Sequence, residues 1–280
     1  MPEVGEIRAH AERVAADLDG ATLAAFRPLS FSILKTFAPD PNEAVGEKFN
    51  GIRTRGKYLV LDFGSISFAI HLMQGGRLRP DEKQAAKPRN GQALWTFEDG
   101  RAYLLTEAGS DKRAGIWVVS AGLPLDDIEP LSHLGPDFDS LSEVELGELL
   151  REQSMRLHGW LRRQSLIAGI GRRLANEICH EAMISPFAMT AKLAPEQVSR
   201  LHAAMTVSLA RSLEFERSQT EIVASAKRAS RVHNRTGEPC PRCAEALREV
   251  VYNKYTVHYC AACQTGGKVL ADNTTSKFLK

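Results

Sequence analysis

The sequence predicts an α+β protein of more than one domain, in which a β-sandwich headed by a helix precedes a helical domain and a C-terminal zinc hairpin. Three observations support this prediction: a series of short β-rich segments in the first half of the chain, a helical pattern from Ser142 to about Arg217, and two Cys-x2-Cys pairs near the C-terminus. The chain has 280 residues, of which 43% are hydrophobic, so it can build two cores beside a small metal module.

The first half of the chain is expected to fold as a helix followed by a sandwich. Apolar side chains recur at helical spacing over residues 3–18, which predicts an amphipathic helix. Short segments rich in β-branched and aromatic residues follow, separated by turn signals such as Asp99-Gly100. They predict antiparallel strands at Tyr58–Phe63, Ile66–Leu72, Ala93–Phe97, Ala102–Leu105 and Ile116–Val119.

Glycine and proline mark the crossing into a second domain. Gly122-Leu-Pro and Gly135-Pro-Asp are turn signals, and the pattern that follows them is helical. We therefore expect an N-terminal domain over residues 1–125, a helical domain over 135–228 and a zinc module over 229–280. Without an apolar run long enough to cross a membrane, the chain is expected to be cytoplasmic.

Four of the five cysteines have the spacing C-x2-C-x16-C-x2-C, from Cys240 and Cys243 to Cys260 and Cys263. Two turns that each supply a pair of thiolates suit a single tetrahedral Zn²⁺ site. Two disulfides are the alternative, but so few cysteines and the lack of an apolar leader segment argue against an oxidising environment. A site of four thiolates is structural rather than catalytic.

The net charge of +2 hides an asymmetry along the chain. Residues 101–150 contain three Lys or Arg against ten Asp or Glu, whereas residues 151–235 contain fourteen against seven. An excess of positive charge beside a zinc module is typical of nucleic-acid binding, because contact with phosphates releases counterions. Ordinary solvated helix faces are the alternative, and charge alone leaves both open.

A two-glycine turn, Gly169-Ile-Gly171, opens a predicted helix that starts at Arg172. Backbone N–H groups at a helix start can hold a phosphate. For a lone G-x-G, a tight turn between helices where glycine relieves a close contact is the favoured interpretation.

Several motifs occur together and carry a resemblance to a known family. They are Pro2-Glu3, Arg55-Gly-Lys57-Tyr-Leu, His71-Leu-Met, Ile167-Ala-Gly-Ile-Gly171, and Gly237-Glu-Pro-Cys240 leading to Cys263-Gln264. In these motifs and in their order, the chain resembles the formamidopyrimidine-DNA glycosylase and endonuclease VIII family along its whole length. The resemblance implies a helix-two-turn-helix architecture for the helical domain and a β-hairpin zinc finger, with double-stranded DNA between the two halves.

The resemblance implies a base-excision-repair DNA glycosylase that is also an abasic-site lyase, with Pro2 as its nucleophile. After removal of Met1, Pro2 carries a free secondary amine, and the positive end of the following helix favours its unprotonated form. The amine would attack the sugar C1′ of an oxidised nucleotide, expel the base, and lead to strand cleavage by β- and δ-elimination. Glu3 is the implied acid–base partner, Glu6 supports the site, and Lys57 contacts the phosphate or the leaving oxygen.

Enzymes of this kind must extrude the target nucleotide and fill the gap in the stack. The resemblance assigns this role to Met73 or Gln74 in one sandwich loop, and to Arg113 in another, where it faces the orphaned base. In this chain Ala114 follows Arg113, and an alanine cannot act as an aromatic wedge.

Further DNA contacts are implied in the second half. Arg172 would grip a phosphate where the family usually has asparagine, and Glu177 matches the family. His158 stands near the position at which the family commonly has a lysine that contacts DNA. In the zinc hairpin, Tyr255 occupies the position of a usual arginine, so Lys254 is expected to supply the charge there.

The expected protein is thus a monomer, associated with the nucleoid, that binds one structural Zn²⁺ and double-stranded DNA with damaged bases or abasic sites. The alternative function is that of a paralogue that binds damaged or structured DNA with weak or altered glycosylase activity. A zinc-finger regulator is a more distant alternative, because it would not require the Pro2-Glu3 start. The sequence leaves open whether the substrate is an oxidised purine, an oxidised pyrimidine or a crosslink.

Overall fold

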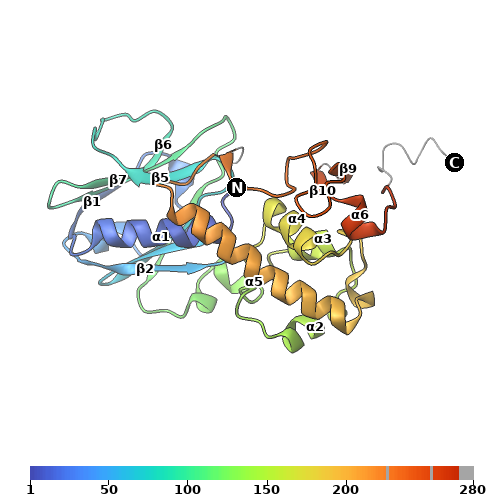
Figure 1. Ribbon diagram of the computed structural model, residues 1–280. Coiled ribbons are helices and arrows are strands. Elements are labelled where there is room, and N and C mark those ends of the chain that lie inside the picture. The colour runs from blue at the N-terminus through green and yellow to red at the C-terminus, as the bar shows by residue number, and fades with distance from the viewer. Residues whose placement is uncertain (225–226, 253–254, 271–280) are drawn as a thin grey trace. The chain divides into compact units, whose positions relative to one another are not determined.

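A computed structural model describes residues 1–224, 227–252 and 255–270 (Figure 1). The chain divides into two compact units, the first made of Met1–Leu134 and Glu216–Val223, and the second of Gly135–Phe215 with the chain from Ala224 onward. The cysteine-rich hairpin belongs to the same unit as the helices, and the prediction of residues 229–280 as a separate module stays a prediction. No helix within the described ranges combines the length and apolar composition that a membrane crossing requires.

The first unit is a β-sandwich headed by helix α1 (Val4–Leu18), which confirms the predicted fold class for this half. One sheet has the order β1-β6-β7-β5 and the other the order β2-β3-β4-β8, with every pair antiparallel. The strands are β1 (Leu23–Pro28), β2 (Phe49–Arg55), β3 (Tyr58–Phe63), β4 (Ile66–His71), β5 (Gly76–Pro80), β6 (Gly91–Phe97), β7 (Ala102–Glu107) and β8 (Gly115–Ser120). Four short 3-10 helices lie between or after them: η1 (Phe31–Ile33), η2 (Pro41–Ala44), η3 (Leu125–Asp127) and η4 (Leu131–His133).

Aromatic side chains from both sheets fill the sandwich core. Phe26 of β1 lies 4.9 Å, centroid to centroid, from Phe68 of β4, and Phe68 lies 5.7 Å from Trp95 of β6. Ile7, Val14 and other apolar residues of α1 join the same core, which explains the helical spacing seen in the sequence. The sandwich therefore holds α1, and with it the start of the chain, against a fully buried apolar interior.

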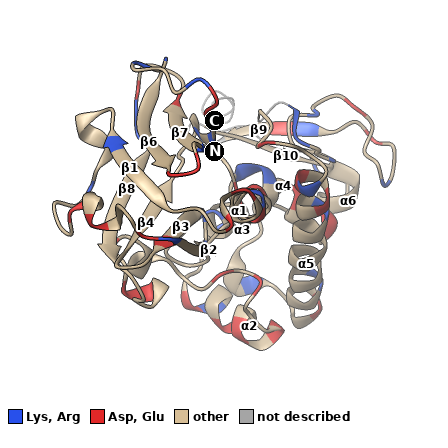
Figure 2. Cartoon of the chain, turned by 90° about the vertical axis from the view of Figure 1, so that its left-hand side faces the viewer, with Lys and Arg blue, Asp and Glu red and all other residues tan. Residues whose placement is uncertain are grey.

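The second unit contains helices α2 (Glu143–Glu152), α3 (Leu157–Leu161), α4 (Arg172–Glu181), most of α5 (Pro195–Arg217) and α6 (Ala261–Thr265), with the 3-10 helix η5 (Thr190–Lys192). Its β-hairpin is formed by β9 (Arg248–Tyr252) and β10 (Tyr255–Tyr259), which pair in antiparallel register. Both helical and hairpin parts agree with the predicted fold class. Three of the ten acidic residues in the acidic segment 101–150 lie on α2, where red dominates in Figure 2.

Ser142 begins α2 by reciprocal hydrogen bonds with Glu145. The Ser142 hydroxyl accepts from the Glu145 N–H at 3.3 Å, and the Glu145 carboxylate accepts from the Ser142 N–H at 2.8 Å. This capping box satisfies two backbone donors at the helix start. Part of the acidic segment thus has a local structural role.

Candidate active site and metal centre

The start of α1 buries two carboxylates directly after Pro2. Glu3 is the N-cap residue, and its backbone N–H donates to the Glu6 carboxylate at 2.8 Å. Only 3% of Glu3 and none of Glu6 is exposed. Acidic groups are favourable in the first helical turn, where they face unsatisfied N–H groups and the positive end of the dipole. Helix capping thus fixes two acidic side chains directly after Met1, which carries the terminal amine, and Pro2.

Strand order gathers three loops at one end of the β2-β3-β4-β8 sheet. Tyr58 pairs with His71, and His71 pairs with Gly115, so the Gly56-Lys57 turn, the end of β4 and the start of β8 are neighbours. Lys57 is 7% exposed in this turn. Antiparallel register therefore collects residues that are far apart in the sequence.

His71 reports the charges around this end of the sheet. Its pKa is lowered to about 4, first by burial and then by the positive charges of Lys57 and of the N-terminal amine. The Nδ1 atom of His71 accepts a hydrogen bond from the backbone N–H of Met73 at 3.0 Å. The imidazole is therefore neutral at pH 7, and the amine and Lys57 both lie within electrostatic range of it. His71 lies in one of the motifs that carry the family resemblance, but no local pattern predicts its position between these charges.

The loop after β4 presents Met73 and Gln74. Met73 has a positive φ of 49° and is half-buried, whereas Gln74 is exposed. The turn closes through a 2.8 Å hydrogen bond from the Gly76 N–H to the Leu72 carbonyl. A Cβ on Gly76 would lie 2.1 Å from that carbonyl oxygen, so only glycine fits. The loop geometry is thus fixed while its tip stays accessible.

A buried carboxylate organises the loop that carries Arg113. One oxygen of Glu107 accepts from the backbone N–H groups of Arg113 and Ala114, at 2.8 and 2.9 Å. The Arg113 side chain is 67% exposed and pairs with Asp111 at 2.6 Å, while Ala114 is part of the sandwich core. Glu107 was not found from the sequence, because an acid at the end of a strand resembles any surface residue there.

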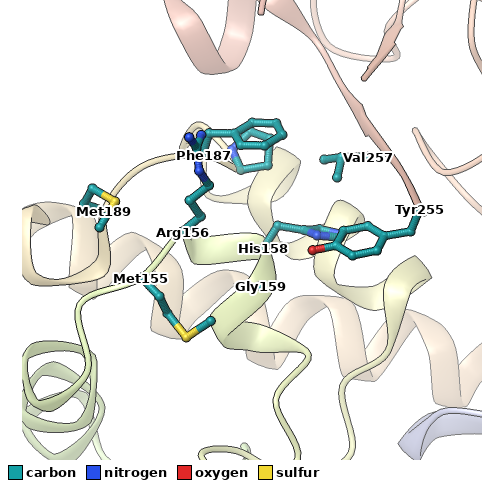
Figure 3. Close-up of a pocket in the computed structure, with 9 residues that line it drawn as sticks. Met155, Arg156, His158, Gly159, Phe187, Met189, Tyr255 and Val257 are labelled. Atoms are coloured by element: carbon teal, nitrogen blue, oxygen red, sulfur yellow. The ribbon is translucent and has the colours of Figure 1, made fainter. Parts of the chain in front are cut away.

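The second unit places His158 against Tyr255 (Figure 3). Their ring centroids are 5.8 Å apart with an interplanar angle of 30°, and both residues line a cavity of about 310 Å³. His158 is 2% exposed, and burial is the largest cause that lowers its pKa to about 3. His158 is therefore a neutral, buried ring at pH 7. Lys254, expected to supply charge here, lies outside the described residues.

Arg172 is the exposed first residue of α4, directly after the N-cap Gly171. Gly171 offers no side chain to cap the helix, and the first turn contains Arg172 and Arg173 but no acid. Backbone N–H groups at such a helix start are anion-binding groups. The predicted phosphate role of Arg172 stays a prediction.

Glu177 is bound within the protein. Its two oxygens accept from the backbone N–H groups of Arg231, Val232 and His233 at 2.9, 3.1 and 2.9 Å. Beside it, the Asn176 side-chain carbonyl accepts from the His258 N–H at 3.3 Å. Helix α4 therefore holds the segment that leads into the hairpin, and this role was missed in the sequence because the partners are backbone groups more than fifty residues away.

The four cysteines form one cluster. Their Sγ atoms all lie within 4.8 Å of one another, with Cys240 to Cys263 at 3.9 Å and Cys243 to Cys260 at 3.4 Å. Disulfide sulfurs are bonded at about 2.05 Å, whereas thiolates bound about 2.3 Å from one zinc ion stand about 3.8 Å apart. All five cysteines are free thiols, so the geometry fits a metal ion and not two disulfides.

Comparisons with known proteins agree with these features. Residues 1–110 match the family model of the formamidopyrimidine-DNA glycosylase N-terminal domain. A Mycobacterium tuberculosis protein described as an uncharacterized formamidopyrimidine-DNA glycosylase-like protein is 41% identical over 149 residues, which cover 94% of that protein and 52% of this chain. The formamidopyrimidine-DNA glycosylase of Chloroflexus aurantiacus is 28% identical over 94% of this chain and 98% of its own length.

Solved structures share the fold. A Lactococcus lactis formamidopyrimidine-DNA glycosylase, non-covalently bound to DNA containing an abasic site, has a TM-score of 0.82 at 21% identity, covering 94% of this chain and 99% of its own. A MutM complex with DNA that contains carbocyclic 8-oxo-G has the same TM-score and identity. The fold is that of a two-unit protein with a helix-headed sandwich and a cysteine-rich hairpin. This chain belongs to the formamidopyrimidine-DNA glycosylase family.

Proposed function

We propose that this protein is a DNA glycosylase and abasic-site lyase of base excision repair, acting as a nucleoid-associated monomer on double-stranded DNA with oxidised bases or abasic sites. Family membership supports the glycosylase reaction. One observation supports the lyase step: the terminal amine, which Met1 carries in this structure, and Lys57 both depress the pKa of buried His71, while Glu3 and Glu6 are buried in the helical turn that follows Pro2. An amine, a cation and two carboxylates are thus available at one end of the sandwich.

In the proposed reaction the unprotonated Pro2 nitrogen forms a bond to the sugar C1′ as the bond from C1′ to the base breaks. The departing base takes a proton, and the sugar ring then opens to an iminium as O4′ is protonated. The iminium acidifies the C2′ proton; its loss breaks the C3′–O bond and releases the 3′ phosphate. A second elimination releases the 5′ phosphate, and water then hydrolyses the iminium to free Pro2.

The neighbouring groups have distinct parts in this proposal. Glu3 donates a proton to the sugar oxygen and later accepts a proton again. Its single carboxyl group thus alternates between the protonated and the ionised form. Glu6 fixes Glu3 through its backbone N–H, as the 2.8 Å bond supports. Lys57 stabilises the negative charge of the phosphate or the leaving oxygen. Neutral His71 adds no further positive charge that would compete with this cation.

DNA contacts follow from the exposed residues of the loops. Met73 or Gln74 fills the gap left by the extruded nucleotide, and Arg113 faces the orphaned base after release from Asp111. Arg172 binds a backbone phosphate at the start of α4, and Glu177 keeps the chain that leads to the hairpin in position. His158 is a buried neutral ring and would contribute to DNA binding indirectly, by packing against Tyr255.

The four cysteines would hold one Zn²⁺. When bound, the ion supplies a structural cross-link between the two ends of the hairpin module and takes no part in bond breaking. The four cysteines come from two short turns, so the metal would add a cross-link to the small apolar clusters around Leu247 and Tyr259.

Borohydride trapping tests the lyase proposal. Protein whose free Pro2 is verified by mass spectrometry is incubated with a labelled duplex that contains one abasic site, and the iminium is reduced. We expect a covalent adduct with wild type, and none with Pro2→Gly or with protein whose N-terminus carries an uncleaved extension. Ala16→Ser, at an exposed position of the same helix, serves as a matched control, and its adduct yield should equal that of wild type.

Absence of an adduct from wild type with free Pro2 would refute the lyase step. The same protein is then assayed on duplexes that carry oxidised purines, oxidised pyrimidines or a crosslink opposite each base. Release of one of these bases supports the glycosylase step, whereas tight binding of all of them without release supports the alternative of a damage-binding paralogue.

A further inference from the structure

Tyr255, the first residue of β10, contacts a cation as well as a histidine. The guanidinium carbon of Arg162 lies 4.0 Å from the centroid of the tyrosine ring, which is within the range of a cation–π interaction. The imidazole of His158 lies against the same ring, as Figure 3 shows. All three residues belong to the second unit. The hairpin and the segment around α3 thus meet in a stack of His158, Tyr255 and Arg162.

This stack restricts what Tyr255 can do. Its aromatic surface already contacts a guanidinium and an imidazole, so the ring is poorly suited as a stacking platform for an unpaired base. Arg162 is half-buried, and a guanidinium that lies over an aromatic face has little conformational freedom left to lose when it binds a ligand. That planar fork matches the oxygens of a phosphate. The chemistry of the stack therefore favours phosphate binding through Arg162.

His158 connects this arginine with the start of α4. The imidazole is 2% exposed, and neither ring nitrogen forms a hydrogen bond of normal geometry within the described part of the chain. Burial and then the charge of Arg162 lower its pKa, whereas the nearby backbone of Arg172 raises it. The charge of Arg162 and the backbone at the uncapped start of α4 thus both act on one buried neutral ring. Such a grouping attracts anions.

We propose that Arg162 is a ligand for a DNA backbone phosphate and that Tyr255 positions it. The proposal rests on the proposed function, because that function makes double-stranded DNA the source of the phosphate. Tyr255 contributes the aromatic face, His158 supports the ring from its buried position, and Arg162 provides the contact to DNA. Tyr255 thereby positions the positively charged Arg162 against a phosphate, although the tyrosine carries no charge itself.

Binding measurements test the proposal without relying on catalysis. Fluorescence anisotropy is recorded for a duplex with a stable abasic-site analogue at several salt concentrations. We expect Arg162→Ala to weaken binding about tenfold at ~0.1 M salt and to reduce the slope of log K against log salt by about 0.9, the change for one phosphate contact. Arg162→Lys should keep the slope but lose part of the affinity. Arg151→Ala, which removes an exposed arginine of α2, is the matched control and should match wild type.

Tyrosine variants test the positioning role. Tyr255→Phe keeps the aromatic face and should bind within about twofold of wild type, whereas Tyr255→Leu removes it and should weaken binding severalfold. In the Tyr255→Leu background, Arg162→Ala should cost less than it does in wild type. Thermal unfolding of each variant separates a local loss from misfolding, and only variants with a wild-type transition enter the comparison.

The outcomes distinguish this proposal from the proposed function. If wild type binds and cleaves DNA while Arg162→Ala has an unchanged affinity and salt slope, the phosphate role is wrong and the proposed function stands. If wild type forms no covalent adduct but Arg162→Ala still reduces affinity and slope, the phosphate role stands and the lyase proposal fails. Equal losses from Tyr255→Phe and Tyr255→Leu would contradict positioning by the aromatic face.

Discussion

The Nε2 atom of His180 lies 3.2 Å from the Sγ atom of Cys240, the first cysteine of the metal cluster. The backbone carbonyl of His180 also accepts from the Arg242 side chain at 2.7 Å, so the last turn of α4 contacts both a proposed ligand and the turn between two ligands. His180 is fully buried. A hydrogen bond to a thiolate from outside the ligand set orients the ligand and strengthens its hold on the metal.

Replacement of His180 should therefore weaken metal binding. We expect His180→Ala to lower the affinity for zinc about tenfold or more, the usual effect of losing a group that orients a ligand. Competition with a chromophoric chelator measures the affinity and the release rate. His202→Ala is the control, because His202 bonds the Leu141 carbonyl and lies outside the cluster. Equal release from His180→Ala and wild type would contradict the assignment.

Removal of the metal should loosen the hairpin and weaken DNA binding. The purified protein is expected to contain one zinc ion, measurable by elemental analysis. Chelation should lower the affinity for an abasic-site duplex and increase hydrogen exchange in β9 and β10, because the metal closes this module. Exchange in the sandwich strands should not change. Full DNA affinity in metal-free protein would show that the hairpin is not a clamp.

Acid should destabilise the first unit through His71. Its pKa falls from the usual value near 6.5 to about 4 on folding, so the unfolded chain binds more protons between these values. The contribution of neutral His71 to the free energy of unfolding is therefore complete above pH 6.5 and is lost as the pH falls toward 4. The total loss is about 3 kcal/mol at most. Denaturant unfolding at pH 7 and pH 4.5 should show a smaller loss for His71→Asn than for wild type. His133→Asn, at an exposed histidine, should behave as wild type.

Loss of the Glu107 carboxylate should free the loop that carries Arg113. Glu107→Ala leaves two backbone N–H groups without their acceptor, which costs about 1–3 kcal/mol if they stay buried. We expect faster hydrogen exchange at the amides of Arg113 and Ala114. Asp111→Asn changes an exposed acid in the same loop and should leave these amides protected. Unchanged exchange in Glu107→Ala would mean that other contacts hold the loop.

The predictable part of the fold was the part with a strong local pattern. Strand Tyr58–Phe63 and the helix that ends at Leu18 were predicted to within one residue, because apolar periodicity and tight turns coincide there. Strand β2 was missed, since Gly51 has a φ of 131° beside a register shift and most of the strand is half-buried. A half-buried pattern with a glycine resembles a loop.

For the site, spacing was informative and long-range contacts were not. The four cysteines are predictable because a metal needs its ligands in two short turns. Arg162 gives no such signal, because it contacts Tyr255 more than ninety residues away, and that contact exists only once α3 and the hairpin have packed. Glu107 is similar: its importance depends on backbone N–H groups, whose direction a sequence does not encode locally.

The bonds that fasten the hairpin to α4 have an evolutionary consequence. Glu177 and Asn176 grip main-chain N–H groups of Arg231, Val232, His233 and His258, groups that every residue except proline possesses. Substitutions at Arg231 and Val232 can therefore change the side chains without removing these bonds, whereas the imidazoles of His233 and His258 also lie within hydrogen-bond distance of the Asn176 amide. A hairpin attached through main-chain groups can change side chains and gain new contacts, while its hydrogen bonds to α4 are retained.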